Sequence, residues 1–112
     1  MIFVIDEEEV KLNEGFTSLY FYAPWMPYHK KCMIMIEKME EKFPQLKFLA
    51  IDTDQFKGLV TRFDVTSVPT FIVFSDGIEK KRMVGYILTS AFKSVFIDIF
   101  KAPTQKEENK NG

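Results

Sequence analysis

The chain has 112 residues, of which 46% are apolar and 28% are charged. This length and composition predict one globular domain and exclude a disordered chain. Fifteen Lys and Arg residues against sixteen Asp and Glu residues leave a formal charge of −1, whereas nucleic-acid-binding proteins concentrate positive charge, so we expect no nucleic-acid partner. The single cysteine, Cys32, excludes a disulfide within the chain.

The first five residues are apolar but form too short a run for the core of a signal peptide, and an acidic run follows them at once. No stretch approaches the roughly 18 apolar residues that a membrane-spanning helix needs. We therefore expect a cytoplasmic protein with no membrane partner.

In the first half of the chain, residues 2–5 are expected to form a short strand, and Asp6 is a candidate N-cap for a short acidic helix. Residues 17–22 are rich in β-branched and aromatic side chains, which favours a second strand. A longer helix is predicted over residues 27–43, because Pro27 suits a first helical turn and the apolar residues recur at helical spacing. That apolar stripe is Cys32, Met35, Ile36, Met39 and Phe43.

The second half of the chain continues the alternation of strands and helices. Residues 48–52 read as a strand, residues 56–63 as a short amphipathic helix, and residues 70–74 as a strand covered on both faces. Residues 75–77 are Ser, Asp and Gly, a turn signal that predicts a hairpin with a more exposed strand over residues 81–84.

A last helix is expected to begin at Thr89 or Ser90, and residues 102–112 form a polar tail that we expect to be disordered. The core stripe of this helix is Phe92, Val95, Phe96, Ile99 and Phe100. This order predicts an α/β fold with a central mixed sheet of about five strands, mostly parallel with an antiparallel C-terminal hairpin, flanked by about four helices.

Two stretches carry a resemblance to a known family. Residues 21–32 run from a strand through Trp25, Met26, Pro27, Tyr28 and His29 into a helix, and residues 66–71 read Thr-Ser-Val-Pro-Thr-Phe before the next strand. Together they resemble the thioredoxin family, whose strand-to-helix turn reads Trp-Cys-Gly-Pro-Cys. The resemblance covers residues 2–100 and implies a thioredoxin-like domain over residues 1–101. It also implies that the Val68–Pro69 peptide is cis and lies against the turn at Trp25.

The residues that would perform the redox chemistry of this family are different here. Met26 stands where the family has the attacking cysteine, and His29 stands where it has the resolving cysteine. Tyr20 and Ala50 replace the buried carboxylate and its lysine partner. Disulfide exchange needs one thiolate to attack and a second thiol to resolve the mixed disulfide. We therefore expect no dithiol–disulfide oxidoreductase activity, and the catalytic positions are degenerate.

Cys32 and His29 each allow a second interpretation. Cys32 could act as a single redox thiol, but its place on the apolar stripe favours an inert, buried side chain. His29 could make a pH-dependent contact, or it could be a polar residue that supports the turn. The two side chains are three residues apart and could bind a metal, but a closed site needs about four ligands, so we predict no metal and no cofactor.

The leading hypothesis is a redox-inactive, chaperone-like module that binds protein or peptide segments. Exposed Trp, Tyr and Met side chains are typical anchors of interfaces, and an extended segment can pair with backbone beside them. The predicted binding residues are Trp25, Met26, Tyr28, Val68, Pro69 and Gly85. The alternative is a single-cysteine thiol oxidoreductase that acts through Cys32 with glutathione. A third hypothesis, a structural subunit of a larger assembly, is not separated from the first by the sequence.

Overall fold

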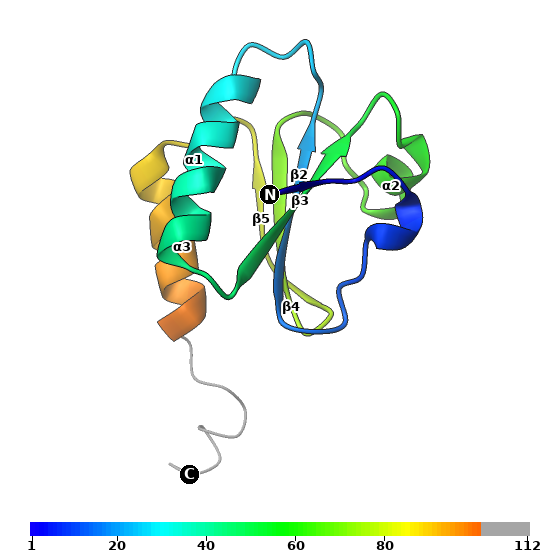
Figure 1. The fold of residues 1–112 in the computed structure, drawn as a ribbon. Coiled ribbons are helices and arrows are strands. Elements are labelled where there is room, and N and C mark those ends of the chain that lie inside the picture. The colour runs from blue at the N-terminus through cyan, green and yellow to red at the C-terminus, as the bar shows by residue number, and fades with distance from the viewer. Residues whose placement is uncertain (102–112) are drawn as a thin grey trace.

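The computed structural model describes residues 1–101, which form a five-stranded mixed sheet with helices on both faces (Figure 1). The sheet order is β1-β3-β2-β4-β5. Strands β1 and β2 run parallel to β3, whereas β4 is antiparallel to β2 and β5 is antiparallel to β4. The strands are β1 (Ile2–Phe3), β2 (Phe16–Tyr22), β3 (Leu46–Asp52), β4 (Thr70–Ser75) and β5 (Ile78–Val84).

Three α-helices connect or follow these strands: α1 (His29–Lys42), α2 (Lys57–Arg62) and α3 (Thr89–Lys101). Figure 1 shows α1 and α3 together on one side of the sheet and α2 on the other. The predicted α/β fold with a five-stranded mixed sheet is confirmed. The prediction for residues 102–112 lies outside the described residues.

The predicted helix after Asp6 is shorter than expected, and the described residues hold three α-helices rather than about four. It is a single turn of 3-10 helix, η1 (Glu7–Glu9). Asp6 is its N-cap, because its carboxylate accepts from the N–H of Glu8 and the Glu9 carboxylate accepts from the N–H of Asp6. The helix ends here because the next residue, Val10, packs into the buried core below α2.

Strand β2 is the centre of the sheet and is buried on both faces. Leu19 and Phe21 face the cluster under α2, while Tyr20 and Tyr22 face the cluster under α1 and α3. This alternation follows from the two-residue period of a strand. It places two phenol rings at the end of β2 from which the chain turns toward α1.

The core between the sheet and α3 is largely aromatic. The ring of Phe92 lies with its centroid 4.8 Å from that of Phe71 and 4.9 Å from that of Phe96, and Phe48 packs against both helical rings. All four side chains are fully buried. The phenylalanine-rich sequence therefore supplies one contiguous layer that fixes α3 on the sheet.

The hairpin predicted at residues 75–77 is present between β4 and β5. Asp76 and Gly77 have φ angles of +47° and +85°, which suit a tight two-residue turn. Strand β5 begins at Ile78, earlier than the expected residue 81. The backbone of Ile78 pairs with that of Ser75, and such pairing does not require the side chains of this exposed edge strand to be buried.

Within residues 1–101, no helix is both long enough and apolar enough to cross a membrane.

We expect Phe92→Ala to lower the free energy of unfolding by about 3–5 kcal/mol, because it removes the ring at the centre of the aromatic layer and leaves a cavity. Urea unfolding followed by circular dichroism measures this change. The control is Ile78→Ala, which truncates an exposed side chain and should change stability by less than about 1 kcal/mol. Equal losses in the two variants would contradict the assignment of Phe92 to the core.

Candidate functional site

The candidate site lies where β2 ends and the chain turns into α1. The turn begins at Ala23, whose carbonyl accepts from the N–H of Met26 at 3.0 Å, and the Met26 carbonyl accepts from the N–H of His29 at 3.3 Å. The predicted helix starts at His29 rather than at Pro27, because these two hydrogen bonds complete separate turns before the helix begins. Two consecutive turns thus carry the side chains of Trp25, Met26 and Tyr28.

Trp25 is the most exposed of these side chains, at 72%. Its indole N–H donates to the carboxylate of Asp54 across the end of the sheet, at 3.0 Å. The ring is therefore held in place while its faces remain open to solvent. Sequence reasoning identified Trp25 but missed Asp54, whose only signal was its position just after a predicted strand.

Met26 differs from the expectation that it contributes exposed surface. Its side chain is only 6% exposed and packs with Cys32 and Met35 in the core cluster under α1 and α3. A flexible thioether fills such a gap well. Met26 is therefore a core side chain, and Trp25 and Tyr28 supply the exposed surface of the turn.

The side chain of His29 contacts the central strand of the sheet. Its Nδ1 lies 2.8 Å from the hydroxyl of Tyr20. The imidazole also stacks on the ring of Tyr22, with centroids 4.4 Å apart and planes 8° from parallel. The interpretation of His29 as a polar residue that supports the turn agrees with these contacts.

Burial determines the protonation states of Tyr20 and His29. It raises the pKa of Tyr20 far above its usual range, with smaller contributions from Cys32 and Tyr22, so the phenol keeps its proton. Burial also lowers the pKa of His29, and the negative charge of Asp52 opposes this only in part. The phenol hydroxyl can therefore donate to Nδ1 of a neutral imidazole. That arrangement leaves the imidazole proton on Nε2.

Cys32 lies one helical turn after His29 and is fully buried. Burial raises the pKa of the thiol, and a contact with the Tyr20 hydroxyl opposes this more weakly. A thiol that is both inaccessible and protonated is a poor nucleophile. The burial and the raised pKa of the thiol favour the structural role for Cys32 over the redox role.

The second stretch singled out by the sequence, residues 66–71, lies beside the turn. The Val68–Pro69 peptide bond is cis. The Pro69 carbonyl accepts from the N–H of Gly85 at 2.8 Å, and Gly85 has a φ of +92°, a conformation that suits glycine. Within residues 1–101, neither the N–H nor the carbonyl of Val68 takes part in a hydrogen bond.

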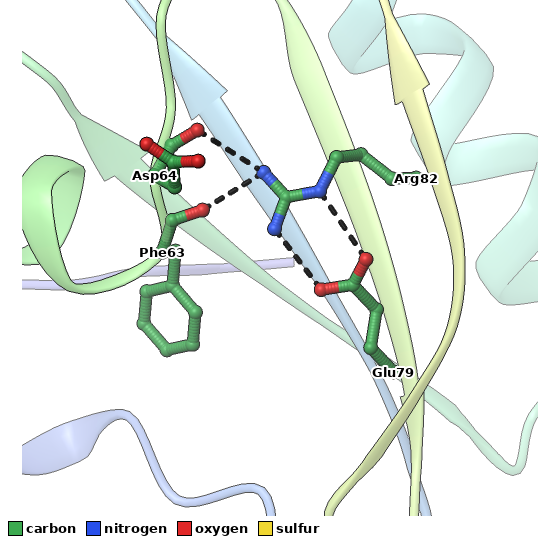
Figure 2. A network of polar contacts seen from close by, with 4 residues as sticks. All are labelled: Phe63, Asp64, Glu79 and Arg82. Carbon is green, nitrogen blue, oxygen red and sulfur yellow. Dashed lines mark hydrogen bonds and ion pairs between the residues drawn. The ribbon is translucent and has the colours of Figure 1, made fainter.

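Arg82 of β5 fastens the start of the same loop, as Figure 2 shows. Its guanidinium donates to the carbonyls of Phe63 and Asp64, at 2.8 and 3.3 Å, and to the carboxylate of Glu79. Strand β5 and the residue that follows it therefore hold the loop at both ends, through the Arg82 side chain and through the Gly85 backbone. No pattern in the sequence pointed to Arg82, because its partners are carbonyls about 18 residues away.

An open cavity of about 440 Å³ lies between the turn and this loop. We call this cavity the groove. It is lined by Trp25, Thr53, Val60, Val65, Thr66, Ser67 and Val68. Of the predicted binding residues, the structure brings Trp25 and Val68 together in its lining, whereas Pro69 is buried beneath it.

Tyr28 does not line the groove but pairs with a residue that sequence reasoning missed. Its ring stacks on that of Tyr86, with centroids 4.8 Å apart. Tyr86 directly follows Gly85, so the pairing adds an aromatic surface next to that predicted binding residue. The sequence signal that could have identified Tyr86 is an aromatic residue directly after Gly85, the glycine that follows the predicted strand.

Among residues 1–101, no group of three or more His, Cys, Asp or Glu side chains is placed to hold a metal ion.

A mixed sheet with this order, helices on both faces and a turn packed beside a cis-proline loop defines a thioredoxin-like α/β protein. The thioredoxin family model matches residues 6–98, and the chain belongs to the thioredoxin family.

Its relatives agree with this assignment. A thioredoxin of Mycoplasma genitalium is 30% identical over 93 residues, covering 83% of this chain and 87% of that protein. Thioredoxin-1 of Saccharomyces cerevisiae is 35% identical over 65 residues, covering 58% of this chain and 63% of that protein. The crystal structure of thioredoxin from Trypanosoma brucei brucei superposes with a TM-score of 0.82 at 26% identity, covering 91% of this chain and 92% of the other. Against that family pattern, this chain has one cysteine and no Cys-x-x-Cys pair.

We expect the chain to lose stability as the pH falls from neutrality through the pKa of His29, because the unfolded chain then binds a proton that the folded chain resists. Above the ordinary histidine pKa of about 6.5 both states are neutral and this contribution to stability is complete. His29 is the only histidine, so a proton NMR titration of its imidazole reads the pKa directly.

The titration should give a pKa below that of a histidine in the urea-unfolded chain. His29→Gln is the matched variant, and it should flatten the pH dependence of unfolding between about pH 7 and pH 5. A folded-state pKa equal to or above the unfolded value would contradict the partly buried, neutral imidazole.

Proposed function

We propose that this chain is a redox-inactive, chaperone-like module that binds extended protein segments in the groove beside the Val68–Pro69 loop. The observation that carries the proposal is the contrast between Met26 and His29, whose side chains are engaged within the chain, and Trp25, whose side chain is exposed. The two positions of the family's cysteines hold a buried thioether and a hydrogen-bonded imidazole, while Trp25 beside them stays exposed.

The proposed mode of binding uses the open backbone of Val68. An extended segment that lies across the loop can exchange hydrogen bonds with Val68 as an added strand. Alternate side chains of such a strand would then point into the groove, against Trp25 and Val65. Backbone pairing would supply affinity for many sequences, and the apolar lining would select large apolar side chains.

The chemistry of the two substituted positions supports binding without turnover. A thioether has no proton to lose and forms no mixed disulfide, so Met26 cannot replace an attacking thiolate. The Nδ1 atom of His29 is already engaged by Tyr20. A bound segment would therefore be released unchanged.

The alternative, a single-thiol reaction of Cys32 with glutathione, has the burial of the sulfur against it. Glutathione would have to reach a side chain that lies beneath the helix and the turn. Burial also keeps this thiol protonated at neutral pH.

We expect Trp25→Ala to weaken the binding of peptides at least about tenfold, because truncating a tryptophan at the centre of an interface commonly costs 2 kcal/mol or more. The probes are peptides selected from a displayed random library on the wild-type chain. Isothermal titration calorimetry with the synthesised peptides gives the affinities.

The control for this measurement is Ile78→Ala, which removes an exposed apolar side chain at the start of β5 and should leave the affinities unchanged. Failure of the library to yield peptides that depend on Trp25 would refute the binding proposal. Catalytic reduction of insulin in the presence of a dithiol would refute its redox-inactive part.

We expect alkylation of Cys32 by iodoacetamide to be at least about tenfold slower in the folded chain than in the urea-unfolded chain, because the thiol is buried and protonated. Mass spectrometry follows the single modification. Equal rates in the two states, with a thiol pKa near neutrality, would instead favour the glutathione-dependent enzyme.

A further inference from the structure

An exposed apolar surface lies next to the groove and is not explained by the core. We call Tyr28, Tyr86 and Leu88 the tyrosine platform. The two tyrosine rings are stacked, and Leu88 two residues later is 67% exposed. Exposed aromatic side chains that are already stacked lose little freedom when a partner covers them.

The charged residues that follow Tyr28 at the start of α1 are both basic. Lys30 and Lys31 follow Tyr28 in the first turn of α1 and are both exposed. Neither α1 nor α3 has an acidic residue in its first turn. In residues 1–101, neither lysine takes part in an ion pair. The first turn of α1 therefore presents two lysine ammonium groups that a partner could neutralise.

The two acidic groups nearest the turn, Asp52 and Asp54, already accept hydrogen bonds. The Asp54 carboxylate accepts from the indole N–H of Trp25. The Asp52 carboxylate accepts from the backbone N–H groups of Asp54 and Gln55, at 2.8 and 3.3 Å. The carboxylates near the turn are thus already engaged in hydrogen bonds, whereas the exposed Lys30 and Lys31 in the first turn of α1 take part in no ion pair within residues 1–101.

From this asymmetry we propose that the recognised segment is acidic as well as apolar. A large apolar side chain of the partner packs on the tyrosine platform, and Asp or Glu side chains next to it lie against Lys30 and Lys31. This inference rests on the proposed function and names the chemistry of the segment that the site selects. Complementary charge favours the acidic segment, and a basic segment is disfavoured by like-charge repulsion.

The first test is the composition of the peptides that depend on Trp25. Peptides selected on the wild-type chain should be enriched in Asp and Glu close to an aromatic or aliphatic residue. Each selected peptide is then resynthesised with Lys in place of its acidic residues. At low salt the acidic form should bind about tenfold more tightly, and the difference should shrink as salt screens the charges.

Two double variants, matched in their change of net charge, test the role of Lys30 and Lys31. Lys30→Glu combined with Lys31→Glu should remove the preference for the acidic form or invert it. Lys38→Glu combined with Lys47→Glu makes the same change of net charge at exposed positions farther along α1 and near the start of β3. This second pair should keep the preference, so a loss in both pairs would point to net charge and overturn the proposal.

The other outcomes separate this inference from the proposed function. Peptides that depend on Trp25 but show no acidic preference would overturn the inference and leave the proposed function standing. Absence of any peptide that depends on Trp25 would overturn both. The chain itself carries an exposed Ile5 before four acidic residues, so a second copy is a competing occupant. Self-association in analytical ultracentrifugation that disappears in the Lys30/Lys31 variant would overturn the proposal in favour of that copy.

Discussion

The hydrogen bond between the Tyr20 hydroxyl and Nδ1 of His29 is the constraint on which the geometry of the site depends. It joins the most central strand of the sheet to the first residue of α1. Because Tyr22 also stacks on the imidazole, the start of the helix is held from two adjacent side chains of β2. The turn between them must then place Met26 inward and Trp25 outward. A neutral histidine satisfies this constraint better than a charged one, since the pocket is partly desolvated.

Met26 and His29 both make contacts that stabilise the turn. Met26 packs in the apolar cluster that includes Cys32, and His29 makes a hydrogen bond with the buried phenol of Tyr20, whose hydroxyl also contacts Cys32. A buried polar group without a partner is costly, so Tyr20 and His29 are best understood as one unit. Replacing either residue alone would disturb the other. This coupling gives a physical reason for Tyr20 and His29 to occur together.

Most of the fold was predictable from the sequence because its signals are local. The apolar run that becomes β4 and the Ser75-Asp76-Gly77 turn needed no knowledge of the rest of the chain. The site was only partly predictable. The turn and the loop were located, but the inward position of Met26 depends on a gap between α1 and the sheet that only packing reveals. The contacts made by Tyr86 and Arg82 likewise join segments that are far apart in the chain.

The hydrogen bond that holds the Trp25 indole has a consequence for the thermodynamics of any encounter at this site. An exposed tryptophan normally samples several rotamers, and fixing it on contact costs conformational entropy. Here Asp54 restricts the ring before an incoming chain arrives. The indole N–H is also occupied, so contacts to the ring are made through its π faces. Association at Trp25 should therefore carry the negative heat-capacity change of apolar burial.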